Sequence, residues 1–366
     1  MDRKTGGSSR RLMDIDKKKI FKVLDPNRIW IPILLGLGIV FYLFYSDPNI
    51  TADNLHLIFD AKLSSVLVAF LVLLARDAGY AYRIRVLSDH ELNWSKSIVI
   101  IILWEFSSAV TPSVVGGTAV AVFIFMAEGI NVGKSLAYVM LTAIMDNLFF
   151  VIAAPLVMLF THGLIFPEVS AMDIQYGSSL QFFFFLSYAL IAVYTLIMSY
   201  ALFVRPRAFK WFLLKMTSLK YLKKWKEKAN QYGDEIILAS SGLKGKATSY
   251  WVKISAATVF IWSARYLMLN SLVEAYHTLT ISEHMVVFSR QVIMWIVMLI
   301  SPTPGSSGTA EYFFNQFFYE YLGDYTFVSS IFWRLMSYYP YLILGAIFLP
   351  RWVRSKFFKK DKKATS

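Results

Sequence analysis

The chain has 366 residues, of which 57% are hydrophobic, 17% aromatic and 17% charged. A soluble domain carries about 25% charged residues, so this composition excludes an ordinary water-soluble fold and predicts a protein surrounded by lipid. The sequence contains no cysteine, which excludes disulfide bonds, thiolate metal sites and cysteine nucleophiles.

The net charge of +13 would suit a nucleic-acid partner, but the positions of the basic residues argue against one. Of the 37 Lys and Arg residues, nine lie in residues 1–30, twelve in residues 205–253 and seven in residues 351–366. These three regions flank apolar segments, as cytoplasmic loops do beside an anionic leaflet. We therefore expect these basic residues to lie beside a membrane leaflet and expect no nucleic acid as a partner of this chain.

Eight apolar stretches approach the roughly 20 residues that a helix needs to cross a bilayer core. They are residues 29–46, 63–84, 96–111, 135–160, 180–204, 250–275, 285–301 and 325–349. They predict an all-α polytopic membrane protein with a single transmembrane domain over residues 29–350. A basic segment, residues 1–28, precedes this domain and a basic tail, residues 351–366, follows it. The first apolar run lacks a cleavage pattern, so we expect an uncleaved anchor.

Two similar breaks interrupt the apolar pattern, at residues 111–119 and 301–311. With one gap, both read Thr-Pro, a short spacer and Gly-Thr-Ala, which indicates an internal repeat. Pro and Gly free backbone groups that protein or cavity water must satisfy at membrane depth. Each break is followed by roughly 13 to 15 apolar or aromatic residues, too few for an upright crossing. The breaks therefore predict two re-entrant half-helix hairpins in addition to about eight transmembrane helices.

The charges of the loops predict which side of the membrane each loop faces. Three loops, residues 47–61, 161–179 and 276–284, lack Lys and Arg and are expected outside. The basic loop of residues 205–249 and both chain termini are expected in the cytoplasm, and Arg83, Arg85 and Lys96 are expected to return the chain there. The predicted location is thus the cytoplasmic (inner) membrane.

This sidedness places the two broken hairpins in opposite orientations. The first hairpin, residues 96–134, enters from inside, and the second, residues 285–324, enters from outside. They form an inverted-topology repeat with cores at residues 96–160 and 285–349. Transporters use such repeats to place irregular backbone and half-helix N-termini at a shared midplane site.

Backbone and hydroxyl groups of the two breaks are the first candidates for substrate binding. They belong to Thr111, Pro112, Gly116, Gly117, Thr303, Pro304, Gly305 and Gly308. The half-helices beginning near Gly117 and Gly308 would direct their positive dipole ends at the site, which favours an anionic guest. The Thr hydroxyls equally suit helix capping.

Ionisable side chains at membrane depth are the second set of candidates, because burying a charge there is costly. They are Arg76, Asp77, Glu105, Asp146, Arg265, Arg290, Glu311 and Arg334. Arg290 and Arg334 are expected beside the tips, where a guanidinium fork would bind a phosphate. Glu105, Asp146 and Glu311 would contact a cationic moiety or carry a coupling proton, and Glu105 and Arg265 would alternatively pair. The other interpretation is that all eight form structural ion pairs.

At these residues the chain resembles a known family. The sequence from Pro302 to Glu311, followed by the Arg-bearing segment of residues 333–340, is similar to the flippase-like transmembrane region of lysylphosphatidylglycerol synthases and to related stand-alone bacterial membrane proteins. In the first half, the Thr-Pro and Gly-Gly pairs, Gly129 and Asp146 follow in the same order. The resemblance covers roughly residues 15–355.

The resemblance implies a flippase-like protein that moves an anionic phospholipid or a lipid-linked phosphate head group between leaflets. The sequence departs from the family pattern at Thr118, where Glu is usual, and at Thr142 and Ala143, where Glu-Arg is usual. The cytosolic aminoacyl-transferase domain of the full-length synthases is expected to be absent, so the chain should not synthesise lysyl lipid.

Enzyme signatures fail in this sequence. Residues 133–135 lack the first Gly of a phosphate loop, and the five His residues show no zinc spacing. We therefore expect no catalytic residue, no metal and no cofactor, with a homo-oligomer possible. The alternatives are a membrane-embedded transferase or phosphatase on a lipid-linked substrate and a non-catalytic envelope-assembly scaffold.

Within the basic loop, residues 221–228 are expected to form an amphipathic helix on the inner leaflet.

Overall fold

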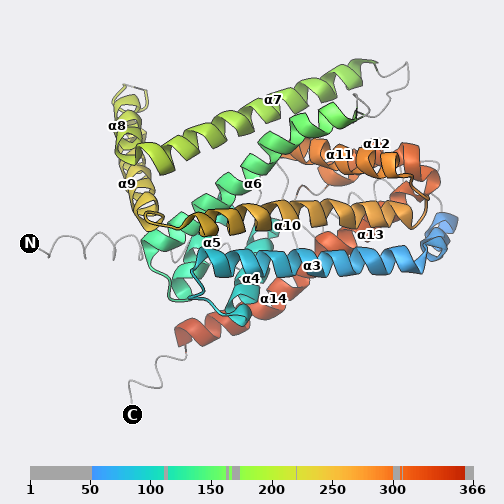
Figure 1. The fold of residues 1–366 in the computed structure, drawn as a ribbon, viewed down its shortest axis with the longest axis horizontal. Helices are drawn as coiled ribbons and strands as arrows, with labels where there is room; N and C mark the ends of the chain where they lie inside the picture. The colour runs from blue at the N-terminus through green and yellow to red at the C-terminus, as the bar shows by residue number, and fades with distance from the viewer. Residues whose placement is uncertain are drawn as a thin grey trace, which may run out of the picture.

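The computed structural model describes residues 52–110, 114–161, 165–166, 174–219, 221–299, 306 and 308–358, and within them the fold is helical without a strand (Figure 1). The longest helices are α3 (Leu63–Leu87), α6 (Val132–Phe160), α7 (Ile174–Ser199) and α10 (Thr248–Glu274). The shorter helices are α4 (Trp94–Val110), α5 (Val114–Ala127), α8 (Pro206–Met216), α9 (Lys226–Gly242), α11 (Ile281–Met298), α12 (Thr309–Leu322), α13 (Thr326–Ser337) and α14 (Tyr339–Val353).

Six helical stretches in the described residues are long and apolar enough to cross a membrane. Five of them agree with predicted spans: α3, α6, α7 with its π-helical extension to Val204, α10 and α11. The sixth is the stretch Thr309–Lys356, which contains α12, α13 and α14. The predicted span at residues 29–46 lies outside the described residues. The fold class predicted from the sequence, an all-α multi-pass membrane protein, is confirmed.

Local sequence signals explain where several helices begin. The side chain of Asn131 accepts a hydrogen bond from the backbone N–H of Lys134 at 2.9 Å and so caps α6. Thr280 and Glu283 form a reciprocal capping box at the start of α11. Such caps satisfy backbone N–H groups that the first turn of a helix leaves without a partner.

The predicted last span, residues 325–349, is not one helix. It divides into α13 and α14 at Tyr338, whose φ of −129° and ψ of −59° are not helical. Pro340 follows two residues later, and proline disfavours a continuous helix because it lacks an N–H and its ring crowds the preceding turn. The prediction of a single span was therefore wrong, and the break proves central to the site described below.

Loops that were predicted to lie inside gather at one end of the molecule. Glu128, after α5, accepts hydrogen bonds from Trp352 Nε1 and Lys356 Nζ, both at 2.8 Å, which joins the ends of α5 and α14. Ion pairs of Lys134 with Glu91 and of Lys246 with Asp89 join the remaining loops of this end. We call it the basic end; that it faces the cytoplasm remains a prediction.

Loops that were predicted to lie outside meet at the opposite end. The backbone N–H of Lys62, before α3, donates to the carbonyl of Ala275, after α10, at 2.9 Å. Tyr325, between α12 and α13, donates to Asp60 Oδ2 at 3.5 Å. Figure 1 shows α3 and α10 side by side along the whole length between the two ends.

Helices α4 and α5 form a hairpin that opens at the basic end, because Lys96 of α4 lies 3.9 Å from Glu128 at the end of α5. Helices α11 and α12 open at the other end, where the His277 and Tyr321 rings lie 6.2 Å apart. Both α5 and α12 have 14 residues, or about 21 Å at 1.5 Å per residue, shorter than a bilayer core. Their insertion as re-entrant hairpins remains a prediction.

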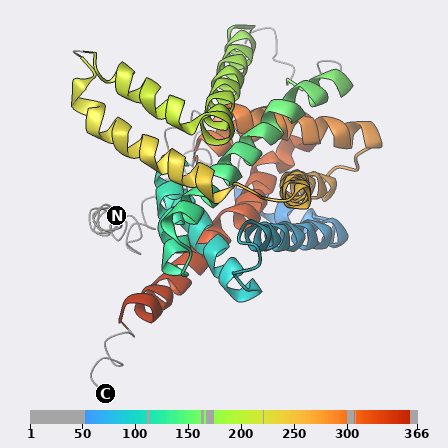
Figure 2. The same cartoon turned by 60° about the vertical axis from the view of Figure 1, so that its left-hand side comes forward.

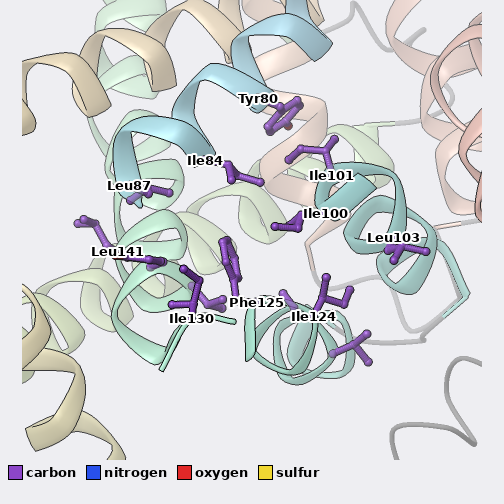
Figure 3. Close-up of a cluster of buried hydrophobic side chains, with 14 of the residues drawn as sticks. Tyr80, Ile84, Leu87, Ile100, Ile101, Leu103, Ile124, Phe125, Ile130 and Leu141 are labelled. Atoms are coloured by element: carbon purple, nitrogen blue, oxygen red, sulfur yellow. The ribbon is translucent and has the colours of Figure 1, made fainter. Parts of the chain in front are cut away.

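Two apolar clusters fill the bundle and a polar layer separates them. The first surrounds the α4–α5 hairpin and includes Tyr80 of α3, Ile144 of α6 and Phe125 of α5; many of its members are drawn in Figure 3. The second surrounds the α11–α12 hairpin and includes Leu73 of α3 and Phe150 of α6. Along α3 and α6, the charged residues Arg76, Asp77 and Asp146 fall between these clusters, away from both ends.

The basic loop forms a helical hairpin of α8 and α9 at the basic end (Figure 2). Residues 221–228, predicted as one amphipathic helix, instead include the turn between these helices, a short 3-10 helix (Lys223–Trp225) and the start of α9. That prediction was therefore wrong. Pro206 begins α8 and ends the preceding π-helical turn, since its ring cannot continue a helix.

Close approach of α14 and α4 depends on Gly345, because a Cβ at this position would overlap the ring of Phe106. We expect Gly345→Val to lower the free energy of unfolding by about 1–3 kcal/mol through overpacking. Phe106→Ala should restore part of that loss when the two substitutions are combined. Unfolding of purified protein in mixed micelles measures both effects; an unchanged stability of Gly345→Val would contradict this packing.

Candidate functional site

The α4–α5 and α11–α12 hairpins each turn at a tip, and described residues beside the two tips meet at the break between α13 and α14. The hydroxyl of Tyr338, in this break, donates to the carbonyl of Ala109 at the end of α4, at 3.2 Å. The guanidinium carbon of Arg334, one turn earlier, lies 4.8 Å from the centre of the Tyr338 ring. Arg334 in turn contacts the beginning of α12. Residues beside three interruptions of helical structure, after α4, before α12 and between α13 and α14, therefore lie together in one buried region. We call this region the tip junction.

Arg334 and Glu311 form the charged centre of the tip junction. Arg334 Nε and Nη2 donate to the two oxygens of Glu311 at 2.7 and 3.2 Å, the two-pronged geometry that a guanidinium adopts with a carboxylate or a phosphate. Both side chains are buried, with 7% and 3% of their surfaces exposed. Each charge is therefore stabilised by the other, because neither side chain is solvated by water.

Backbone groups before α12, at the tip of the α11–α12 hairpin, form hydrogen bonds with this pair. Arg334 Nη2 also donates to the Ser306 carbonyl at 3.3 Å, and the Gly308 N–H donates to Glu311 Oε2 at 2.6 Å. Gly308 has a φ of +84°, a conformation that favours glycine. The predicted residues Gly308, Glu311 and Arg334 are thus brought together. Thr303, Pro304 and Gly305 lie outside the described residues.

The first tip is built without charge. Helix α5 begins at Val114, slightly before the predicted start near Gly117, and includes Gly116 and Gly117 in its first turns. A Cβ at Gly117 would lie 2.6 Å from Ser108 Oγ, so glycine allows α5 to approach α4 closely. All 14 residues of α5 are uncharged. Thr111 and Pro112 lie outside the described residues.

Arg290 does not lie beside a tip, so its predicted position was wrong. Its Nη1 donates to the Phe317 carbonyl at 3.0 Å and its Nη2 to Glu320 at 2.6 Å, near the C-terminal end of α12. The tip is at the other end of that helix. A cation beside the last carbonyls of a helix is favourable, so Arg290 holds α11 against α12 rather than lining the tip junction.

A second charged group lies on α3. Arg76 Nη2 donates to Asp77 Oδ1 at 2.8 Å, and the hydroxyl of Tyr341 on α14 lies 2.7 Å from both oxygens of Asp77. Arg76 is completely buried, and its Nη1 has no hydrogen-bond partner among the described residues. Tyr341 follows Tyr338 by three positions, so this group adjoins the tip junction.

Asp146 pairs with a residue that sequence reasoning assigned to the interface. Arg83 Nη1 donates to Asp146 Oδ1 and, at 3.1 Å, to Thr258 of α10, while Trp262 Nε1 donates to Asp146 at 3.0 Å. The expectation that Arg83 marks a cytoplasmic loop was therefore wrong. Arg83 lies seven positions after Arg76, about two helical turns, and this spacing could have placed both on the same buried face.

Glu105 of α4 and Arg265 of α10 lie 3.8 Å apart, as the alternative of an ion pair expected. The guanidinium of Arg265 also lies over the rings of Trp262 and Trp295, at 5.1 and 5.4 Å from their centres. The Nε of Arg265 is a second buried donor that has no partner in the described part of the chain. A buried donor of this kind is costly unless a ligand or water satisfies it.

Each buried Arg thus faces a carboxylate, which agrees with the structural ion-pair interpretation for the described conformation. The carboxylates of the α3, α4 and α6 pairs are nevertheless partly accessible, with 34%, 26% and 22% exposure for Asp77, Glu105 and Asp146. Within the described residues, no group of three or more His, Asp or Glu side chains is arranged to hold a metal.

The described helices and this buried charge layer define a multi-pass helical membrane protein whose two short hairpins open at opposite ends. Comparison with known proteins is consistent with this class. The chain belongs to the lysylphosphatidylglycerol synthase TM region family, whose model matches residues 29–345. It is also 25% identical to a UPF0104 membrane protein of Archaeoglobus fulgidus over 345 residues, which are 90% of this chain and 99% of that protein. No solved structure matches the chain.

Proposed function

We propose that this protein moves an anionic phospholipid or a lipid-linked phosphate head group between the leaflets of the membrane. The observation that carries the proposal is the tip junction, where Arg334 contacts the start of α12 and Tyr338, one turn later, contacts the end of α4. A site between two hairpins that open at opposite ends can become accessible first from one end of the bundle and then from the other, as alternating access requires.

Arg334 supplies the chemistry for an anionic head group. Its fork is occupied by Glu311 in the described conformation, and a phosphate presents oxygens to a guanidinium in the same planar geometry. The head group would bind by taking the place of Glu311, whose carboxylate keeps the Gly308 N–H as a donor. The unpartnered N–H groups of Arg76 and Arg265 would offer further donors.

The partly exposed carboxylates of the same layer suit the remaining parts of a head group. Asp77, Glu105 and Asp146, each now paired with an Arg, would contact a cationic moiety or take up a coupling proton. We further propose that the protein transports its lipid without changing it covalently, so the head group should emerge chemically intact.

Reconstituted vesicles provide the test. We expect a fluorescent phosphatidylglycerol in the inner leaflet of phosphatidylcholine vesicles to become accessible to external dithionite faster with the protein than without it. Replacing Arg334 by Met should slow this by about tenfold or more, since a charge-assisted hydrogen bond contributes about 1.5–3 kcal/mol. Mass spectrometry of the extracted lipid should show the tracer unchanged.

The matched control is Arg351→Met, which removes an exposed Arg at the other end of α14. This variant should transport the tracer at the rate of the unmodified protein. The proposal fails if the anionic tracer crosses no faster than in protein-free vesicles, or if the two Arg variants behave alike. A covalently altered tracer would instead support the transferase or phosphatase alternative.

A further inference from the structure

The α8–α9 hairpin has an outer layer that the transport site does not use. Helix α9 carries buried residues, whereas α8, all of whose residues are described, has none. The two helices are held together by a 2.6 Å ion pair between Lys210 and Asp234. At Gly233, a Cβ would overlap the stem of Lys210. Helix α8 is therefore the outermost layer of the basic end.

The face of α8 that points away from α9 is largely apolar. Trp211, Phe212 and Met216 are exposed to 61%, 50% and 42%. Basic side chains accompany them: Arg207 is exposed on the same face, and Lys215 Nζ lies 4.9 Å from the centre of the Trp211 ring. Grouped apolar side chains at a protein surface mark a site of interaction.

The turn after α8 continues the same composition. Leu219, Tyr221 and Trp225 are strongly exposed, and Lys224 Nζ lies 5.4 Å from the centre of the Trp225 ring. The turn and the first turn of α9 add exposed basic residues at Lys223, Lys224, Lys226 and Lys228. We call this surface, from Trp211 to Lys228, the aromatic–basic surface.

The orientation of the hairpin suits a membrane surface. Figure 1 shows α8 and α9 running across the direction of α3 and α10, at the basic end, and Figure 2 shows the hairpin extending away from the long helices. Because α3 and α10 are long and apolar enough to span the membrane, a helix that lies across them runs along the membrane plane. Helices with aromatic and basic residues occupy that position in interfacial proteins.

We propose that the aromatic–basic surface binds anionic phospholipid head groups of the leaflet at the basic end, with Trp211 and Phe212 inserted among the lipids. The lysines of the turn are attracted to a negative surface, and each raises the affinity for it about fivefold. Aromatic rings are favoured at the head-group level. This inference does not rest on the transport proposal, because it concerns a surface outside the tip junction.

The absence of cysteine allows a direct test on the full chain. We attach an environment-sensitive NBD label at Phe212→Cys in protein reconstituted into phosphatidylcholine vesicles containing phosphatidylglycerol. Its emission should be shifted to the blue relative to the emission of the label in water, and spin-labelled lipids should quench it. A label at Gln231→Cys, on the exposed polar face of α9, serves as the control and should remain as in water. Phe212 is half-exposed, so its replacement should leave the fold intact.

Charge removal tests the head-group preference separately. In the double variant Lys223→Gln/Lys224→Gln, the phosphatidylglycerol fraction needed for the half-maximal shift at residue 212 should rise, because the loss of two fivefold attractions lowers the affinity for the negative surface about 25-fold. The proposal is overturned if the label at 212 is as exposed to water as the label at 231. A shift that grows with the protein-to-lipid ratio would overturn it in favour of contact with a second copy of the chain.

Discussion

Replacing Arg334 by Met is expected to lower the free energy of unfolding by about 3–5 kcal/mol in addition to slowing transport. The substitution leaves the Glu311 carboxylate buried without its cation, and an uncompensated buried charge has about this cost. Titration of the purified protein with sodium dodecyl sulfate in mixed micelles would measure the loss. Because an unfolded protein also fails to transport, this variant alone does not separate a structural role from a substrate-binding role.

The double variant Arg334→Met/Glu311→Gln separates them. Replacing both members of a buried ion pair by uncharged residues often leaves the stability of the fold unchanged or raises it. The introduced amide oxygen would still accept a hydrogen bond from the Gly308 N–H, which now donates to Glu311. We therefore expect stability near that of the unmodified protein together with transport of phosphatidylglycerol at the rate of empty vesicles. A stable double variant that transports normally would show that the pair is structural and would remove the basis of the proposed mechanism.

Replacing Asp77 by Ala is expected to cost a similar 3–5 kcal/mol. Asp77 is the carboxylate partner of Arg76, which is completely buried and gains no solvation in exchange. The loss also removes the acceptor of Tyr341, so the contact between α3 and α14 weakens beside the tip junction. The same detergent titration, with tryptophan fluorescence as the signal, measures the change.

The control for this prediction is Asp234→Ala, which breaks the ion pair with Lys210 on the surface of the α8–α9 hairpin. Asp234 is exposed, so water replaces the lost partner, and the expected cost is below about 1 kcal/mol. Equal losses for the two variants would contradict the assignment of the α3 pair to a buried, water-poor layer.

The sequence was sufficient for features that depend on local composition. Lengths of apolar runs located α3, α6, α7, α10 and α11, because a helix in lipid must be apolar over most of its length. The Gly- and Pro-rich breaks located the starts of α5 and α12 to within a few residues. Among the described connections, loop charges grouped those that meet at the basic end and those that meet at the opposite end. The side of the membrane that each end faces stays a prediction.

Features that depend on contacts between distant helices were not predictable in the same way. Hydropathy places Arg290 within the apolar run of α11, but only packing decides which end of α12 it meets. Arg83 was taken for an interfacial charge because its partner, Asp146, lies 63 positions later. The break at Tyr338 was missed because its neighbours are aromatic and apolar, and the single signal was Pro340.

The contact between Tyr338 and the end of α4 has a mechanical consequence. Tyr338 donates its backbone N–H to the carbonyl of Arg334 at 3.0 Å, so one turn of backbone touches the first hairpin through Tyr338 and the second through Arg334. Loss of the Tyr338 bond to Ala109 would therefore free this turn from the first hairpin while Arg334 still held it to the second. If the protein transports lipid as proposed, this single turn couples the positions of the two hairpins.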